Sequence, residues 1–275
     1  WLLNKTAYIY VEFTRNVPLL LQIILWYAIL IQLPRIKQAP QLLETFYISN
    51  RGLFGPRPIF EEGFNFVFIF IILACVAAFF IRRWSKRRQD QTGQQFPVFT
   101  TNLGLIILLP LIVFFIVGSP MSLEYPILKG FNFKGGMVIR PEFIAMFLAL
   151  TVYTGAFISE TVRSGILSVT KGQREASGAL GLKKNWIMRL IIVPQALRVI
   201  VPPLTSQYLN LTKNSSLGIA VGYADLVHGF GGISLNQTGQ AIECMAITMA
   251  TYLVISLTIS LFMNIYNKSI QFKEK

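Results

Sequence analysis

The chain has 275 residues, of which 53% are hydrophobic and only 13% are charged, and its net charge is +13. A soluble domain usually carries about 25% charged residues, so this composition argues against a soluble fold and for a membrane protein. With one histidine and no G-x-x-x-x-G-K-[ST] phosphate loop, we expect no metal site, no catalytic triad and no ATPase of its own. The chain is therefore expected to be neither an enzyme nor a holder of a cofactor.

The apolar residues cluster in runs of about 17 or more, long enough to cross a bilayer as a helix. Asn16 and Pro18 favour a helix start for the first run, as a capping side chain followed by a ring without an N–H. Since the sequence starts at Trp1 without a methionine, we also expect further residues upstream. We predict an all-α polytopic membrane protein with at least six spans: 17–33, 65–81, 103–118, 142–158, one from Trp186 through Pro194, Pro202 and Pro203, and 244–266.

The distribution of lysine and arginine between the spans predicts the orientation. If the spans alternate, sixteen of these residues lie on one side and seven on the other, with Arg198 and Lys213 inside the fifth span. The richer side is cytoplasmic by the positive-inside rule, and it holds the C-terminal tail and the loop between spans four and five. This arrangement explains the net charge better than nucleic-acid binding does. The densest run, RRWSKRR at 82–88, is interpreted as a topology anchor or a contact for lipid headgroups.

Two long loops, 34–64 and 119–141, lie on the opposite, external side and are rich in proline, glycine and aromatic residues. Such loops could pack as a cap over the helices or meet an external partner, and the sequence leaves both readings open.

The loop between spans four and five predicts a short amphipathic helix over residues 173–182. Glu175 is expected in its first turn, where a carboxylate favours the helix dipole, and Gly181 is expected to end it. Ala176, Ala179 and Leu180 fall at i, i+3 and i+4 and form a narrow apolar stripe. A helix with such small contact residues suits insertion into a groove on a partner protein.

The same loop carries a specific motif: Glu-Ala-Ala, three residues, Gly, nine residues, then Ile-x-Leu-Pro. Here it is Glu175-Ala176-Ser177, then Gly181, then Ile191-Ile192-Val193-Pro194. Ser177 and Val193 replace alanine and leucine, and both remain small or apolar. The loop thus resembles the signature of ABC importer membrane subunits.

Further stretches resemble one branch of that family, the polar amino acid permeases. They are VEFTRNVPLLLQ at 11–22, YTGAFISETVRSGILSVTKGQ at 153–173, PQALRVIVPPLTSQYLNLTKNSSL at 194–217 and LNQTGQAIE at 235–243. The set is similar to the long form of the family, the bacterial general or neutral L-amino acid permeases. The resemblance implies the type I ABC importer fold, with a first conserved block at 1–64, an inserted helix pair at 65–141 and the permease core at 142–275. It also implies further helices before the first block, upstream of Trp1.

The resemblance also implies the function and the partners. The chain would be the permease subunit of an amino acid importer in the bacterial inner membrane. Its partners would be two ATP-binding subunits that bind ATP and Mg²⁺, a second permease (a homologue or a second copy), a periplasmic solute-binding protein and membrane lipid. The loop would be the coupling helix that docks on the ATPase, and the residues assigned to docking are Gly172, Glu175, Ala176, Ser177, Ala179, Leu180 and Gly181.

A polar face on the fifth span is the candidate substrate path. Polar groups are costly where they face lipid, so this face should point into the bundle or a water-filled cavity. The alternative is that these groups only make hydrogen bonds between helices. Glu160 could pair with Arg163 or form part of an inner gate, and pairing alone is preferred. The path candidates are Gln22, Glu160, Gln207, Asn210, Lys213, Asn214 and Ser215.

Two other functions compete with an importer subunit. A self-contained secondary transporter or channel would favour inverted repeats and buried ionisable pairs, and neither is clear here. A membrane scaffold or receptor without transport is disfavoured by the polar face of the fifth span.

Overall fold

The computed structural model describes residues 1–43 and 45–271. Lys273 and Lys275, which the charge count places on the basic side, lie outside the described residues. The chain divides into two compact units, which are treated separately. The first comprises residues 1–35, 49–52 and those from 139 onward, and the second comprises 36–48 and 53–138.

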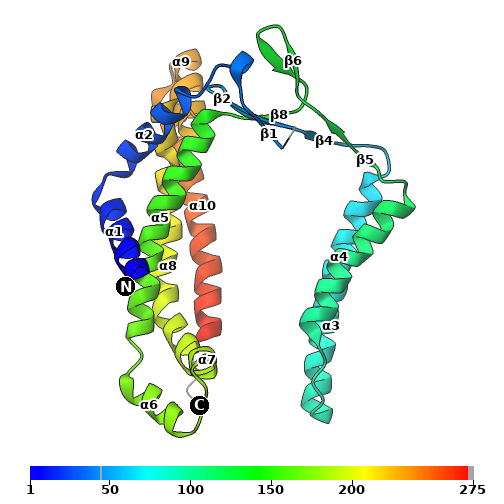
Figure 1. The fold of residues 1–275 in the computed structure, drawn as a ribbon, viewed down its shortest axis with the longest axis vertical. Coiled ribbons are helices and arrows are strands. Elements are labelled where there is room, and N and C mark those ends of the chain that lie inside the picture. The colour runs from blue at the N-terminus through cyan, green and yellow to red at the C-terminus, as the bar shows by residue number, and fades with distance from the viewer. Residues whose placement is uncertain (44, 272–275) are drawn as a thin grey trace. The chain divides into compact units, whose positions relative to one another are not determined.

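The first unit is a helical bundle in which α5, α8 and α10 run side by side (Figure 1). Two short helices, α6 and α7, lie at the end of the bundle where α5 and α10 finish (Figure 1). The long helices are α1 (Leu2–Asn16), α2 (Leu19–Ile31), α5 (Pro141–Leu167), α8 (Val193–Asn214) and α10 (Ala241–Ile270). The short elements are α6 (Lys171–Ala179), α7 (Lys184–Ile187), α9 (Leu235–Thr238), the 3-10 helix η3 (Ser215–Val221) and the π-helices η2 (Met188–Ile192) and η4 (Val227–Ser234).

Five described helices are long and apolar enough to span a membrane, and they match the second to sixth predicted spans. The fifth predicted span is formed by α7, η2, α8 and η3, which join into one stretch of 38 residues, Lys184–Val221. A sixth span exists if α1 and α2, which meet at 105°, are counted together. The expectation of a multi-span helical fold is therefore confirmed.

The start of the first predicted span differs from the expectation. Val17 is extended (φ −94°, ψ 129°) because it precedes a proline, and α2 begins only after Pro18. The prediction that Asn16 caps this helix is wrong, since its Nδ2 donates to the carbonyl oxygen of Glu12 at 2.7 Å. The 13 residues of α2 extend only about 20 Å, less than the hydrocarbon core of about 30 Å.

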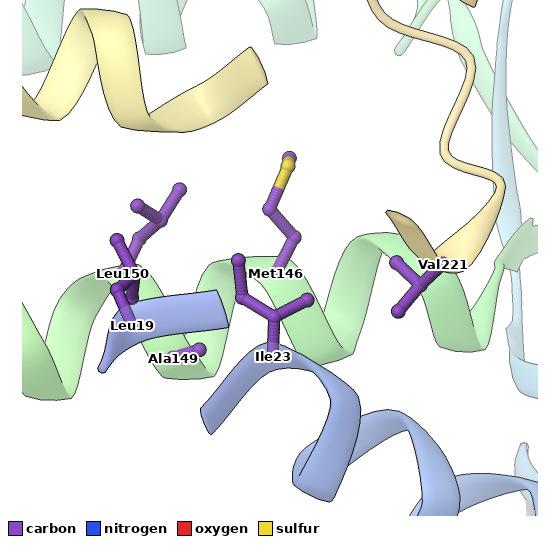
Figure 2. Close-up of a cluster of buried hydrophobic side chains, with 6 residues drawn as sticks. All are labelled: Leu19, Ile23, Met146, Ala149, Leu150 and Val221. Carbon is purple, nitrogen blue, oxygen red and sulfur yellow. The ribbon is translucent and has the colours of Figure 1, made fainter. Parts of the chain in front are cut away.

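A cluster of buried apolar side chains joins α2 to α5 and η3 (Figure 2). Ile23 and Ala149 are fully buried, and the small alanine lets the two helices approach closely. The cluster consists of Leu19, Ile23, Met146, Ala149, Leu150 and Val221.

A second cluster joins the end of α5 to the beginning of the fifth span. Val169, Ile192, Ala196 and Ile200 form it. Gly165 of α5 lies against it, where an added Cβ would overlap Cγ1 of Ile200 and lie 3.3 Å from the carbonyl oxygen of Ala196. The absence of a side chain at Gly165 thus permits the close contact between α5 and α8.

The second unit contains the helix pair α3 (Phe64–Thr92) and α4 (Val98–Ile116), which pack against each other. The two loops at 34–64 and 119–141, for which no strand was predicted, form short strands. A four-stranded sheet has the order β1-β2-β3-β8, and two separate ribbons pair β4 with β5 and β6 with β7 in antiparallel fashion. These elements are η1 (Ile36–Gln38), β1 (Gln41–Leu42), β2 (Phe46–Ser49), β3 (Gly52–Gly55), β4 (Arg57–Phe60), β5 (Met121–Glu124), β6 (Ile127–Lys129), β7 (Asn132–Lys134) and β8 (Met137–Ile139).

The contact at Gly165 gives a test of the bundle. We expect Gly165→Ala to lower stability by about 1–3 kcal/mol, because the added methyl group must push α5 and α8 apart. Thermal unfolding of the purified protein in detergent measures the effect. Gly104→Ala in α4 is the matched control, since its nearest atom, Cδ1 of Leu108, is 4.0 Å from the added Cβ. Equal thermal stability of the two variants would contradict the close packing.

Candidate functional site: the α6 loop and a polar cleft

The predicted loop helix is present as α6, a nine-residue helix that begins at Lys171. Glu175 is its fifth residue, so the prediction that this carboxylate lies in the first turn is wrong. The helix starts two residues earlier than expected because Thr170 already has the extended conformation of an N-cap (φ −60°, ψ 146°).

Gly181 ends α6, as predicted, and it does so with a left-handed backbone (φ +77°). Its N–H donates to the carbonyl oxygen of Gly178 at 2.9 Å, and the N–H of Leu182 donates to that of Ser177 at 3.3 Å. This pair of hydrogen bonds is the Schellman motif, which favours glycine at this position. The α6 helix therefore has a fixed C-terminal end followed by an open surface, since no atom lies within 4 Å of an added Cβ at Gly181.

The side chain of Arg174 holds α6 to the bundle. Nη2 of Arg174 donates to the carbonyl oxygen of Ile166 at 2.6 Å, in the last turn of α5. A cation at the C-terminal carbonyls of a helix is favoured by both the hydrogen bond and the helix dipole. Ser177 is buried, and its Oγ donates to the carbonyl oxygen of Gln173 at 2.6 Å, so the hydroxyl is satisfied within α6. A serine at this alanine position therefore leaves no unpaired polar group.

The remaining predicted docking residues lie on the surface. Leu180 is 82% exposed. The other exposed members are Gly172, Glu175, Ala176, Ala179 and Gly181. The structure thus brings these residues together on one short helix and leaves the small, apolar stripe uncovered by the described part of the chain. Their docking role stays a prediction.

A second candidate site is a polar cleft of about 230 Å³ between α5 and α8. Its volume is below the roughly 300–1,000 Å³ of pockets for drug-sized ligands, so it suits a small molecule. The cleft is lined by Tyr153, Thr154 and Phe157 of α5 and by Gln207, Asn210, Leu211 and Asn214 of α8. Three of the predicted path residues, Gln207, Asn210 and Asn214, therefore meet at one place.

The amide side chains of these three residues make no hydrogen bond to any other described residue. Thr154, which is buried, also lines this cleft, and the ring centroids of Tyr153 and Phe157 lie 4.9 Å apart. The cleft thus offers free amide donors and acceptors on one wall and aromatic rings on the other.

Two further path candidates lie outside this cleft. Lys213 is exposed and is not among the lining residues. Ser215 lines a neighbouring, mostly apolar groove of about 620 Å³, which shares Thr154 and Leu211 with the polar cleft. Its Oγ donates to the carbonyl oxygen of Thr212 at 2.7 Å.

Gln22 has a local structural role at the bend between α1 and α2. Its side chain is buried, and Nε2 donates to the carbonyl oxygens of Thr14 and Val17, both at 3.0 Å. These bonds satisfy carbonyl groups that the interrupted helix leaves without a partner. The proposed place of Gln22 on a substrate path stays a prediction.

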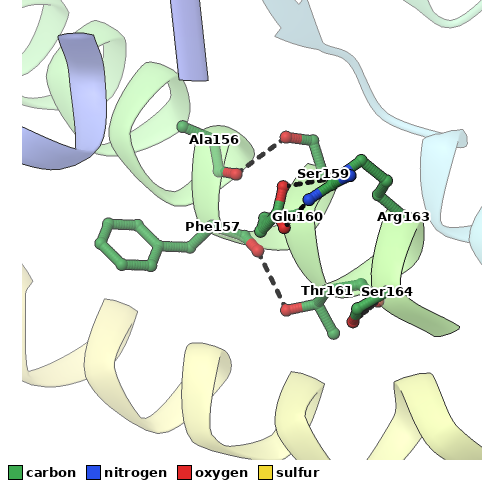
Figure 3. Close-up of polar contacts among 7 residues, drawn as sticks. All are labelled: Ala156, Phe157, Ser159, Glu160, Thr161, Arg163 and Ser164. Carbon is green, nitrogen blue, oxygen red and sulfur yellow. Dashed lines mark hydrogen bonds and ion pairs between the residues drawn. The ribbon is translucent and has the colours of Figure 1, made fainter. Parts of the chain in front are cut away.

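Glu160 pairs with Arg163 on α5, as the preferred reading of the sequence expected (Figure 3). The contact is bidentate, with Nη2 to Oε1 at 2.7 Å and Nε to Oε2 at 2.9 Å. The pair lines a groove of about 560 Å³ against α1, where Lys5 and Glu12 add further charge. Glu160 therefore lies outside the polar cleft, in a different groove. An inner gate at Glu160 stays a prediction.

Sequence reasoning missed four residues at these sites: Tyr153, Thr154, Phe157 and Arg174. The first three occupy i, i+1 and i+4 within the stretch YTGAF, so they share a helix face, but nothing in the sequence says that this face meets α8. Arg174 directly precedes the Glu-Ala-Ser triplet, but the fourth span was predicted to end at 158, so nothing in the sequence indicated that Arg174 reaches the last turn of α5.

Comparisons with known proteins agree with this geometry. The family described as "Binding-protein-dependent transport system inner membrane component" matches residues 71–272. The chain is 50% identical, over its whole length, to the "General L-amino acid transport system permease protein AapQ" of Rhizobium johnstonii, of which it covers 69%. It is also 50% identical over its whole length to the "Putative amino-acid ABC transporter permease protein YhdX" of Escherichia coli, of which it covers 70%.

A third relative is the "Glutamate/glutamine/aspartate/asparagine transport system permease protein BztB" of Rhodobacter capsulatus, with 43% identity over the whole chain and 72% of that protein. The family match covers more than half of the chain, and the membrane-spanning helices described above fit it. The chain therefore belongs to the family of binding-protein-dependent transport system inner membrane components and is a multi-pass membrane permease.

Proposed function

We propose that this chain is the translocation subunit of an ATP-driven amino acid importer in the bacterial inner membrane. Two separate ATP-binding subunits hold ATP and Mg²⁺, a second permease (a homologue or a second copy) completes the path, and a periplasmic solute-binding protein delivers the substrate. The names of three relatives with 43–50% identity support amino acids as the substrate class.

The observation that carries the proposal is the surface of α6. A nine-residue helix with an exposed stripe of Ala176, Ala179 and Leu180 stands at the end of the bundle. Small side chains let the helix backbone approach a partner closely, and the apolar stripe gains free energy when it is covered. Such a surface suits the cleft of an ATPase subunit and has no use in a transporter that works alone.

The attachments of α6 support a mechanical role. Arg174 connects it to the end of α5, and α6 also packs against α7 and η2 at the start of the fifth span. A displacement of α6 by the ATPase would therefore move the ends of two membrane helices together. Those two helices, α5 and α8, form the walls of the polar cleft.

The polar cleft is proposed as part of the substrate path. An amino acid carries an ammonium group, a carboxylate and a side chain, and free amides can meet both charged ends without binding them tightly. The unpaired amides of Gln207, Asn210 and Asn214 support this reading over the alternative of hydrogen bonds that only hold the helices together.

We further propose that the α6 end of the bundle is cytoplasmic, together with the C-terminal end of α10. The two lie at the same end of the first unit (Figure 1). Lysine and arginine concentrate there, and this bias is the usual mark of the cytoplasmic side. The basic residues at this end include Lys171, Lys183, Lys184, Arg189 and Lys268.

Replacing Arg174 with alanine tests the attachment of α6. We expect hydrogen exchange of the amides in 171–181 to accelerate by about tenfold or more, because a charged hydrogen bond contributes about 1.5–3 kcal/mol. Substrate-stimulated ATPase activity of the assembled importer should fall in parallel. Lys171→Ala, an exposed change on the same helix, is the control. Unchanged exchange in Arg174→Ala would show that this side chain does not hold α6.

Replacing Asn210 with leucine tests the cleft. The isosteric change removes an amide from the proposed path, so a charged group of the substrate loses a hydrogen-bond partner. We expect ATP-driven uptake of labelled amino acids in proteoliposomes to fall roughly 5- to 100-fold. The complex should still assemble. Ser206→Ala, on the same helix but outside the cleft, is the matched control. Uptake at the original rate in Asn210→Leu would show that this cleft is not part of the substrate path.

Replacing Gly181 with glutamate tests docking and the importer function itself. The side chain has room within this chain, so the variant should insert normally, while bulk and charge at the end of α6 should dissociate or uncouple the ATPase. Co-purification and ATP-driven uptake measure the two outcomes. Gly93→Glu at the end of α3 is a close control, since Gly93 is also left-handed (φ +69°) with no atom within 4 Å of its added Cβ.

Retained co-purification and uptake in Gly181→Glu would refute the docking role. Ion-driven uptake by the chain alone in liposomes would instead favour a secondary transporter.

A further inference from the structure

The end of α3 carries a concentration of positive charge that the transport proposal does not use. Four of its basic residues, Arg82, Arg83, Lys86 and Arg87, are exposed, and we call them the cationic face. None of the four forms an ion pair or side-chain hydrogen bond with another described residue. Asp90 is the only acid between residues 82 and 97, and it lies one turn beyond.

The cationic face is continuous on the helix. At 3.6 residues per turn, its four members fall within an arc of about 140°. Ser85, which is buried, and Arg88, which is half-buried, point to other sides of α3. The positive charges therefore face outward together, away from the buried side of the helix.

The position of this face along α3 matches the edge of a bilayer. The apolar part of the helix, residues 64–81, is about 27 Å long, close to the roughly 30 Å of a hydrocarbon core. Arg82 and Arg83 follow at once, and Lys86 and Arg87 come one turn later. All four thus lie at the depth of the lipid phosphates.

The surrounding contacts hold this end of the helix in place. The guanidinium of Arg88 lies 5.3 Å from the ring centre of Trp84 and donates to Oε1 of Gln94 at 3.0 Å. Trp84 in turn meets Phe96 edge-on at 5.6 Å, and the indole is 50% exposed, as is usual for tryptophan at a membrane interface. On the α4 side, Nδ2 of Asn102 donates to the carbonyl oxygen of Ala78 at 3.1 Å.

We propose that the cationic face is a binding site for the phosphate headgroup of an anionic phospholipid, such as phosphatidylglycerol. A topology anchor requires only the right number of charges. These residues are in addition unpaired, on one face and carried by a fixed helix, which favours a defined ligand. Arginine is suited to it, because a planar guanidinium donates two parallel hydrogen bonds to phosphate oxygens, and the neighbouring indole packs at the headgroup level.

The test compares the assembled importer with a variant in which Arg82, Arg83, Lys86 and Arg87 are all glutamine. Each complex is titrated in detergent with dioleoyl phosphatidylglycerol or dioleoyl phosphatidylcholine, and bound lipid is counted by native mass spectrometry. We expect the Kd for phosphatidylglycerol to rise at least about tenfold in the variant, since each basic residue contributes about fivefold at a membrane surface. Binding of phosphatidylcholine should not change.

The matched control removes the same number of exposed charges elsewhere in the chain, by changing Arg51, Arg57, Lys129 and Lys134 to glutamine. It should keep the original affinity for phosphatidylglycerol. An equal loss in both variants would reduce the effect to net charge and overturn the proposal. So would full competition by millimolar inorganic phosphate, which would make free phosphate the ligand.

A separate variant distinguishes loss of lipid binding from failure of the chain to insert into the membrane. Exchanging Arg82, Arg83 and Arg87 for lysine keeps the charge, so topology should be retained. The affinity for phosphatidylglycerol should fall by a smaller factor than in the glutamine variant, because lysine loses the paired hydrogen bonds. An unchanged affinity for phosphatidylglycerol in both the lysine and the glutamine variants would show that the cationic face is not the binding site.

Discussion

The close contact of α5 with α8 at Gly165 determines where both candidate sites lie. At this point the two helices approach until a single added carbon would overlap Ile200. Two to three turns away along α5, the same helices leave the cleft between Tyr153 and Asn210. In the other direction α5 ends and the chain enters α6. A rotation of α8 about this contact would therefore change the width of the cleft.

Polar groups inside a membrane protein must find partners within the protein, and most of those described here do so. Gln22 bonds to two carbonyl groups at the α1–α2 bend, and the hydroxyl of Tyr10 donates to the carbonyl oxygen of Val152 at 2.7 Å. Glu160 and Arg163 neutralise each other. The amides on the cleft side of α8 depart from this rule. Unpaired amides are costly in lipid, so their placement on a cleft wall is explained most simply by water or substrate.

The predictable part of the structure was the part that depends on local sequence. Runs of apolar residues located five of the spans, and the left-handed C-terminal end of α6 followed from Gly181 alone. The short helix α6 was also predictable, because the residues that favour it lie within one short stretch of the chain. These features require no knowledge of which helices pack together.

The features that depend on long-range pairing were not predictable. Tyr153 and Phe157 line the cleft only because α5 packs on α8, about 50 residues later in the chain. The ribbon of β4 with β5 pairs Arg57 with Glu124 across the whole α3–α4 insertion. The misplaced cap at Asn16 had a different cause: the effect of Pro18 on Val17 outweighed the capping preference of the asparagine.

The stability of a helix as short as α6 depends on contacts at its end and in its middle. A helix of nine residues is marginal in water on its own, because nucleation costs more than a few hydrogen bonds return. Here the Schellman motif at Gly181 fixes one end, and Arg174 fixes the middle to the last turn of α5. Displacing the helix as a rigid body then costs less than unfolding it. In the proposed coupling, a partner that pushed on the exposed stripe would move α5 and the fifth span, because melting α6 would first require breaking the contact between Arg174 and Ile166.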